Sequence, residues 1–129
     1  MRYLCLIYLN EKELAAMPQH DMDELNRRHL ELNEDLLRSG HFIEAEALTP
    51  GASATCVRVR NGRKAVTDGP YAETKEMVAG FYVIEARDLN EAIAVAARIP
   101  AAPLGVVEVR PCRNLEIDGV PHVASSKPR

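Results

Sequence analysis

Of the side chains in the sequence, His29 is the one best placed to transfer a proton. It stands between Leu25 and Leu32 in a stripe of apolar residues, and the pKa of an unperturbed imidazole lies near neutrality. One interpretation is a general acid or base in a cleft between a helix and a sheet. The other is a histidine packed in the core with a hydrogen-bonded ring nitrogen, and the residues alone leave both open.

The loop at residues 68–76 concentrates charges and hydroxyl groups just before an apolar segment. It reads Asp68-Gly69-Pro70-Tyr71-Ala72-Glu73-Thr74-Lys75-Glu76. As a binding loop, it would offer two or three polar contacts to a small anion or a hydroxylated ligand. As a structural loop, Asp68 would cap a turn, Gly69 would take a positive φ and Pro70 would fix the next φ. Both interpretations stay open.

Metal and cofactor sites find little support in the sequence. The cysteines Cys5, Cys56 and Cys112 are far apart and form no Cys-x-x-Cys pair. His20 and His29 do not have the spacing that would bring two ligands to one face of a helix. No nucleotide-binding glycine loop, Gly-x-Ser-x-Gly elbow or His-Glu-x-x-His motif is present. No metal and no cofactor are therefore expected.

A long helix is predicted to position His29, over residues 19–39. Its apolar stripe repeats at spacings of three and four residues and comprises Met22, Leu25, His29, Leu32 and Leu36. Asp21 and Glu24 have the spacing of a capping box. Gly40 is suited to end the helix in the left-handed conformation.

The remaining elements are mostly strands. They are predicted over residues 3–9, 41–48, 54–60, 64–67, 79–86 and 105–110. Asn61-Gly62 is a strong hairpin signal, because a type I′ turn needs positive φ at both central residues. A second helix begins at Asp88, with Glu91 at the capping-box position.

With the Asn61-Gly62 hairpin counted as one decorated strand, the order of elements reduces to βαββαβ. The predicted fold is therefore α+β and ferredoxin-like, with an extra β-hairpin and both helices on one face of an antiparallel sheet. Strand alternation assigns to the helix-covered face Ala45, Val57, Val59, Val107 and Val109. It assigns to the open face Glu44, Glu46, Arg58, Arg60, Glu108 and Arg110. That open face is either solvated or covered by a second copy of the chain.

Composition limits the partners and the location. With 16 basic and 19 acidic residues the net charge is −3, which argues against a nucleic-acid partner. Aromatic residues are 5% of the chain, too few for a base-stacking platform. No apolar stretch reaches the roughly 18 residues of a membrane span, and no secretory signal pattern is present, so a cytoplasmic protein without membrane contact is expected. We expect one domain at residues 1–112 and a tail at 113–129, frayed at its end.

The loop at 68–76 resembles the signature of the YCII-related family, in particular its DGPF branch, with Tyr71 in place of the phenylalanine. The resemblance covers residues 1–112 and extends to Gly80-Phe81-Tyr82-Val83-Ile84-Glu85, Val57-Arg58-Val59-Arg60-Asn61-Gly62, Asp88-Leu89-Asn90-Glu91-Ala92 and Val107-Glu108-Val109-Arg110-Pro111. It implies a bacterial, cytoplasmic subunit of the dimeric α+β barrel type, and hence a homodimer. Genes of such proteins often neighbour those of extracytoplasmic-function sigma factors.

The resemblance also implies a catalytic pair formed by a histidine of the first helix and an acidic residue near the end of that helix. His29 matches the histidine, but Arg38 stands at the acidic position. Asp68 is then the candidate for the missing carboxylate.

Two hypotheses of function follow. In the first, the protein is an isomerase or lyase acting on a small acid, with His29 as the base and Asp68 as its orienting partner. Arg58 or Lys75 would anchor the carboxylate of that acid, and Tyr71 and Thr74 would complete the ligand-binding set. In the second, the protein is a non-catalytic dimeric module that binds a small molecule or a regulatory protein.

Overall fold

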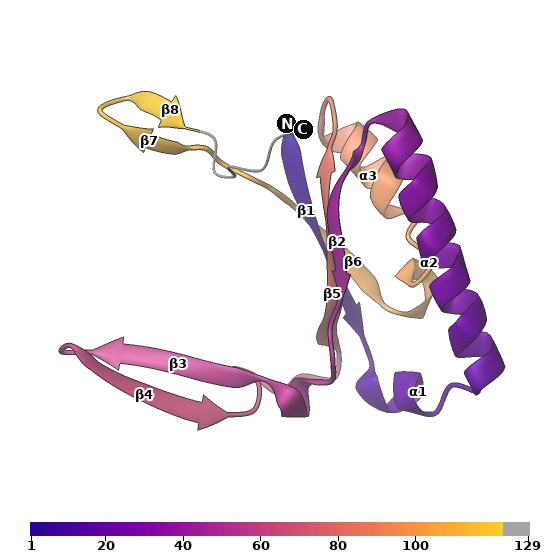
Figure 1. Cartoon of the computed structure of the whole chain (residues 1–129), viewed down its shortest axis with the longest axis horizontal. Coiled ribbons are helices and arrows are strands. Elements are labelled where there is room, and N and C mark those ends of the chain that lie inside the picture. Colours follow the sequence, from indigo (N-terminus) through magenta and orange to yellow (C-terminus); the bar gives the residue numbers. More distant parts are fainter. Residues whose placement is uncertain (123–129) are drawn as a thin grey trace.

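The computed structural model of the chain describes residues 1–122. Four strands form one antiparallel sheet in the order β2-β5-β1-β6. Their bounds are Arg2–Leu9 for β1, Phe42–Ala47 for β2, Met77–Glu85 for β5 and Val106–Pro111 for β6. Helices α2 (Gln19–Ser39) and α3 (Leu89–Ala96) cover one face of this sheet (Figure 1). The architecture is α+β, as predicted, and is compatible with a ferredoxin-like fold.

The hydrophobic core lies between the sheet and the two helices. Alternate residues of β1 are buried there, namely Tyr3, Cys5, Ile7 and Leu9. They pack with Leu32 and Leu36 of α2 and with Tyr82 and Ile84 of β5. Because successive side chains of a strand point to opposite faces, the other half of β1 faces away from the helices.

Helix α2 has the predicted length but begins differently from the prediction. Its N-cap is Pro18, which makes no side-chain capping bond, so the predicted capping box of Asp21 and Glu24 is wrong. The helix starts two residues before Asp21, which therefore lies in the first turn, where its negative charge meets the positive end of the helix dipole. At the other end, Gly40 has φ 80°, and the predicted left-handed cap is confirmed.

Helix α3 begins at the predicted N-cap, and the Asp88 half of the predicted capping box is confirmed. The carboxylate of Asp88 accepts a hydrogen bond from the backbone N–H of Glu91 at 2.9 Å. Glu91 Oε1 in turn accepts one from the backbone N–H of Arg87 at 3.2 Å. The first bond satisfies a donor that a helix N-terminus otherwise leaves without a partner, and the second ties Glu91 to the residue before the N-cap.

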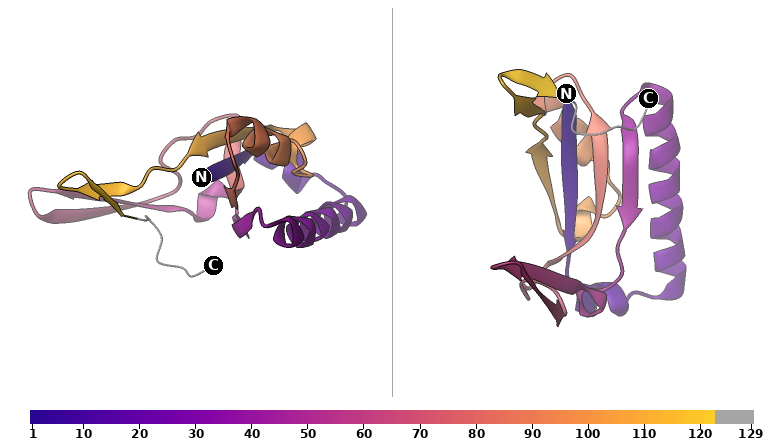
Figure 2. Two further views of the ribbon diagram at one scale, coloured as in Figure 1. Left: turned by 90° about the horizontal axis from the view of Figure 1, so that it is seen from above. Right: turned by 60° about the vertical axis from the view of Figure 1, so that its left-hand side comes forward.

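A hairpin formed by β3 (Thr55–Arg60) and β4 (Arg63–Asp68) lies between β2 and β5 in the chain. Its turn residues Asn61 and Gly62 have φ of 52° and 73°, as the type I′ turn requires. The hairpin extends away from the four-stranded sheet on the side opposite the helices (Figures 1 and 2). Its strands pair only with each other within the described residues.

This placement corrects part of the predicted division into two faces. Val57 and Val59 are 60% and 59% exposed, so they do not belong to the helix-covered face. Arg58 and Arg60 are likewise outside the four-stranded sheet, because their strand pairs, among the described residues, with β4 alone. Val107 and Val109, by contrast, pack against the core as predicted.

Several shorter elements complete the described residues. They are α1 (Glu11–Ala15), two 3₁₀ turns at Gly51–Ser53 and Ala102–Leu104, and a second hairpin of β7 (Leu115–Ile117) and β8 (Val120–His122). That second hairpin falls in the region predicted as a tail, whereas the frayed end predicted at 125–129 lies outside the described residues. Within residues 1–122, no helix has the length and apolar character needed to cross a membrane.

Candidate functional site

A cleft of about 580 Å³ lies between α2 and the sheet. The helix contributes the residues of its inner face, Met22, Leu25, Asn26, His29, Leu30 and Asn33. The sheet contributes Ile7, Leu9, Tyr82 and the stretches 45–48 and 79–81, with Leu14 and Ala101 at the margins. The volume lies within the roughly 300–1,000 Å³ of small-molecule sites, and apolar side chains dominate the lining, as is usual for them.

Three polar side chains in this cleft form a hydrogen-bonded relay. His29 Nδ1 lies 3.1 Å from the hydroxyl oxygen of Tyr82. The Tyr82 hydroxyl donates to Asn33 Oδ1 at 2.7 Å. Tyr82 is only 3% exposed, so its hydroxyl depends on these partners rather than on bulk water.

The relay determines which nitrogen of His29 carries the proton. An amide oxygen can only accept, so the single hydroxyl proton of Tyr82 is directed to Asn33. The Tyr82 oxygen therefore accepts the proton of His29 Nδ1, and in the neutral imidazole Nε2 is left with its lone pair. Within the described residues, Nε2 has no hydrogen-bond partner, so this acceptor is available to a bound molecule.

Electrostatics keep the relay neutral. Burial lowers the pKa of His29 below its ordinary value, and the nearby positive charge of Arg28 lowers it further. Burial also raises the pKa of Tyr82 to about 12. At pH 7 the imidazole is therefore uncharged and the phenol keeps its proton.

Regular secondary structure holds all three groups in place. His29 and Asn33 are four residues apart on α2, so they lie on the same face of the helix. Tyr82 comes from β5, an interior strand of the sheet, and the ring of Phe42 meets its ring edge-on with centroids 6.4 Å apart. The His29 and Tyr82 rings are stacked at 6.2 Å. A site built on a helix and an interior strand is rigid compared with one built on loops.

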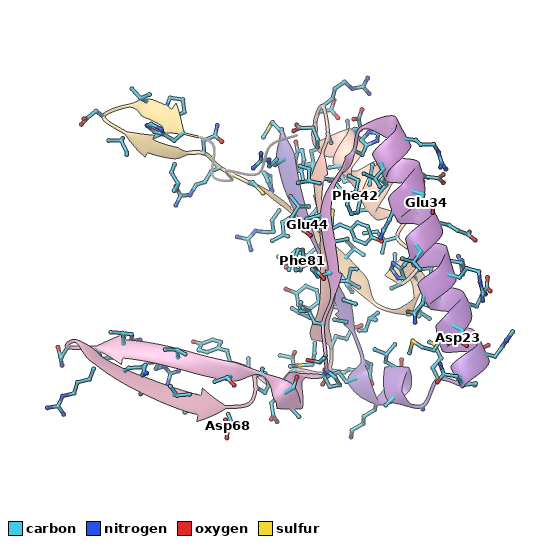
Figure 3. All side chains as sticks on the ribbon, in the orientation of Figure 1. Asp23, Glu34, Phe42, Glu44, Asp68 and Phe81 are labelled. Atoms are coloured by element: carbon cyan, nitrogen blue, oxygen red, sulfur yellow. The ribbon has the colours of Figure 1, made fainter. Side chains whose placement is uncertain are left out.

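Asp68 does not join His29 within the chain. It ends β4, whereas His29 lies on α2, and the two elements are on opposite sides of the sheet (Figures 1 and 3). Arg38, at the position where the family resemblance implied an acid, forms an ion pair with Asp35 instead. The orienting partner of His29 is thus the hydroxyl of Tyr82 rather than a carboxylate.

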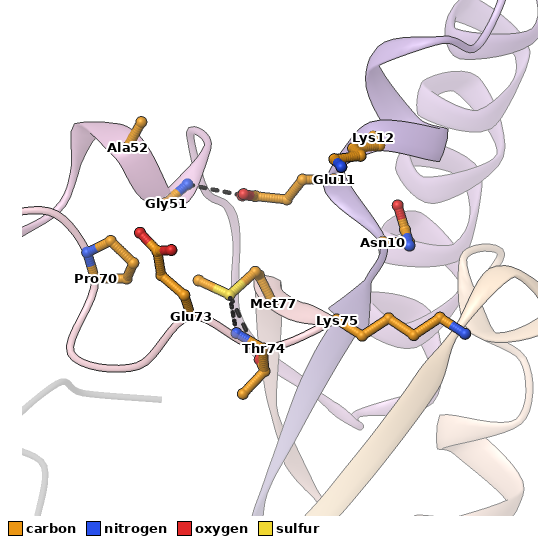
Figure 4. A pocket seen from close by; sticks show the side chains of 10 residues that line it. All are labelled: Asn10, Glu11, Lys12, Gly51, Ala52, Pro70, Glu73, Thr74, Lys75 and Met77. Atoms are coloured by element: carbon orange, nitrogen blue, oxygen red, sulfur yellow. Dashed lines mark hydrogen bonds between the residues drawn. The ribbon is translucent and has the colours of Figure 1, made fainter.

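The other predicted binding residues also lie outside this cleft. The Arg58 guanidinium is 5.9 Å from the centre of the Tyr71 ring, and that tyrosine is 85% exposed. Thr74 and Lys75 border a separate hollow of about 440 Å³, together with Asn10, Glu11 and Met77 (Figure 4). There, Thr74 Oγ1 donates to the backbone oxygen of Glu76, and Glu11 accepts from the N–H of Gly51 at 2.7 Å. The first bond lies within the loop at 68–76, and the second joins α1 to the 3₁₀ turn at Gly51–Ser53.

Tyr82 and Asn33 are the functional candidates that sequence reasoning missed. Asn33 was detectable, because a second polar residue stands one turn from His29 on the face of α2 that carries the apolar stripe. Tyr82 is separated from His29 by 53 residues. The alternation of buried and half-buried residues along β5 indicates that the Tyr82 ring is buried, but it does not indicate which side chain the hydroxyl meets.

Residues 1–122 contain no group of three or more histidine, cysteine, aspartate or glutamate side chains arranged to hold a metal ion. The three cysteines are free thiols, of which Cys5 is buried. The chemistry that the cleft offers from its own residues is therefore hydrogen bonding and proton transfer.

An antiparallel sheet with two helices on one face, and a histidine in the cleft beneath the longer helix, define a small α+β protein with a candidate small-molecule site. The chain belongs to the YCII-related domain family, which matches residues 1–116. An uncharacterised protein of Rhizobium meliloti (strain 1021) is 32% identical over 113 residues, covering 86% of this chain and 91% of the relative. The family resemblance noted from the sequence is confirmed at this level.

Proposed function

We propose that the cleft binds a small organic molecule and that His29 transfers a proton to or from it through Nε2. The observation that carries this proposal is the relay from His29 Nδ1 through the Tyr82 hydroxyl to Asn33 Oδ1. It orients the ring of a residue that lines the cleft and leaves Nε2 as a free acceptor among the described residues, which is what a general base needs. In histidines generally, the hydrogen-bond partner of one ring nitrogen determines whether the other nitrogen carries a proton or a lone pair.

The proton balance of such a step is simple. Nε2 takes a proton from an acidic C–H or O–H bond, the electron pair of that bond stays on the substrate, and His29 becomes an imidazolium. Return of the proton to another atom gives an isomerisation, and departure of a leaving group gives an elimination. Glu46 is the one acidic residue among the described residues that line the cleft, and its position opposite Phe81 directs its side chain to the other face of the sheet, so no described carboxylate stabilises the imidazolium.

The expected pH dependence follows from the lowered pKa of His29. The reaction needs the neutral imidazole, so kcat/KM should rise as His29 loses its proton and should level off above its pKa. Because burial lowers that pKa, the midpoint of the rise should lie below the ordinary histidine value of about 6.5. A pH–rate profile would show this, and a midpoint above the ordinary value would contradict the buried, neutral histidine.

Hydrogen exchange with D₂O tests the proton transfer without knowledge of the natural substrate. A panel of neutral ketones and lactones would be incubated with the protein, and loss of the α-proton signal would be followed by ¹H NMR. We expect exchange with the wild type and with His20→Gln, and only background exchange with His29→Gln. His20 is the matched control, because it is an exposed histidine on the same helix.

If no compound exchanges faster with the wild type than with His29→Gln, the catalytic proposal fails. The cleft would then serve the alternative function, a non-catalytic ligand-binding module.

The loop at 68–76, with Tyr71 in place of phenylalanine, supports the finer assignment to the DGPF branch but adds no catalytic group to the cleft.

We also propose that the open face of the sheet packs against a second copy of the chain. Leu6 pairs with Phe81 and Leu4 with Val83, which forms an apolar centre that is only half-buried. The register places charged residues beside this centre on both outer strands, namely Glu44, Glu46, Glu108 and Arg110. An apolar centre with a rim of both charge signs fits a self-complementary interface.

Sedimentation equilibrium tests the homodimer. We expect a mass of twice 14.3 kDa at micromolar concentration. We expect Leu6→Glu to shift the protein towards the monomer, because a charge would enter the apolar centre of the interface. A wild-type monomer under these conditions would contradict the proposal.

A further inference from the structure

We propose that the cleft around His29 selects an uncharged molecule with a mainly apolar body and a hydroxyl group that donates to His29 Nε2. Such a ligand is a neutral alcohol rather than the small acid expected from the sequence. This inference rests on the proposed function, because it assigns the class of molecule to the same site.

The first argument is the absence of a countercharge. No lysine or arginine is among the described residues that line the cleft. Both sequence-predicted anchors of a carboxylate are elsewhere, Arg58 on the hairpin beside Tyr71 and Lys75 at the other hollow. A carboxylate bound beside His29 would lose its hydration without a lysine or arginine in the lining to pair with, because Arg28, whose charge acts on His29, is exposed and does not line the cleft.

The second argument concerns Glu46, the one charged residue that borders the cleft. In the register of β2 with β5 it stands opposite Phe81, whereas its neighbour Ala45 stands opposite Tyr82. Directly opposed residues share a face of the sheet, and Tyr82 points towards α2. The Glu46 side chain is therefore directed to the open face, and its backbone forms the margin of the cleft. The described groups inside the cleft are neutral.

The third argument is the direction of the available hydrogen bond. The relay directs the His29 proton to Nδ1, so Nε2 can only accept. The ligand group that meets it must be a donor, which a hydroxyl is and an ether or an ionised carboxylate is not.

The fourth argument is the apolar surface that the cleft leaves uncovered. Leu30 on α2 is 64% exposed and Leu48 beyond β2 is 48% exposed, and both line the cleft. Met22, Leu25 and Leu14 continue this surface inward. An apolar ligand body would remove these side chains from water, and the gain is proportional to the area covered.

Three probes of matched size test the inference: 2-naphthylmethanol, its methyl ether, and 2-naphthoate. Binding at pH 7.5 would be measured by calorimetry on the wild type. We expect the alcohol to bind at least roughly tenfold more tightly than the ether or the acid, a difference of about 1.4 kcal/mol. In His29→Phe, which keeps a ring at this position but has no acceptor, the preference for alcohol over ether should disappear.

Tighter binding of 2-naphthoate than of the alcohol would overturn the inference, as would equal binding of the alcohol and the ether by the wild type. Absence of binding by all three probes at about 1 mM, an affinity near −4 kcal/mol, would overturn it as well. None of these results depends on D₂O exchange, so proton transfer by His29 can fail or succeed separately. Glu46→Gln should leave the acid as weak a ligand as before, because that side chain faces away from the cleft.

Discussion

Replacing Tyr82 by phenylalanine is expected to destabilise the fold by about 1–3 kcal/mol, although it removes one oxygen atom only. The loss leaves both the Nδ1–H of His29 and the Oδ1 of Asn33 without their partner in a half-buried site. We also expect the variant to lose the discrimination between alcohol and ether probes, because His29 is then free to place its proton on Nε2. Urea unfolding and calorimetry would measure the two effects.

Tyr3→Phe is the matched control for this variant. Tyr3 is as buried as Tyr82, at 2% exposure, but its hydroxyl makes only a weak contact with Met1 Sδ at 3.8 Å. We expect its removal to change the free energy of unfolding by less than about 0.5 kcal/mol, since no strong hydrogen bond is lost. Equal destabilisation by the two substitutions would show that the relay adds nothing beyond the burial of a tyrosine.

Gly80→Ala is expected to destabilise the protein by about 1–3 kcal/mol and to weaken ligand binding in the cleft. A Cβ at Gly80 would lie 2.7 Å from the backbone oxygen of Glu46 and 3.4 Å from Ala47 Cα. Both atoms belong to the backbone of β2, so the strand itself must move away from β5. Since both segments line the cleft, the shift changes the site as well as the sheet.

Gly51→Ala provides the comparison. A Cβ there would meet the end of the flexible Met77 side chain at 2.9 Å, which can rotate away. We expect a change in stability of less than about 1 kcal/mol, because an alanine also restricts the unfolded chain. If urea unfolding shows that Gly80→Ala lowers the free energy of unfolding as little as Gly51→Ala does, the close approach of β2 to β5 is not a constraint on the fold.

Sequence patterns of a few neighbouring residues predict much of this fold, because the turns and helix faces concerned depend on those residues alone. Gly40 ends α2 in the left-handed conformation, and Asn61-Gly62 makes a hairpin, because few other residues adopt positive φ easily. His29 reaches the inner face of α2 because its spacing from Leu25 and Leu32 is that of a helical stripe. These features follow from a few neighbouring residues each.

The predictions that the structure corrects concern residues whose positions depend on contacts between segments far apart in the sequence. The alternation of Val57 and Val59 is that of a strand with one covered face, but alternation does not tell which sheet a strand joins, and within residues 1–122 β3 pairs with β4 alone. The expected pairing of Asp68 with His29 was made without knowledge of distances, and within one chain the two residues lie on opposite sides of the sheet. The actual partner, Tyr82, lies 53 residues from His29 and meets it through the packing of α2 on β5.

The long-range ¹H–¹⁵N NMR spectrum of wild-type His29, recorded as a function of pH, tests the central claim most directly. The relay predicts a neutral ring with its proton on Nδ1 and a bare Nε2 at pH 7.5, and a pKa below the ordinary histidine value. His20, exposed on the same helix, serves as the internal reference. A neutral ring with its proton on Nε2, or a pKa of His29 at or above the ordinary histidine value, would contradict the account.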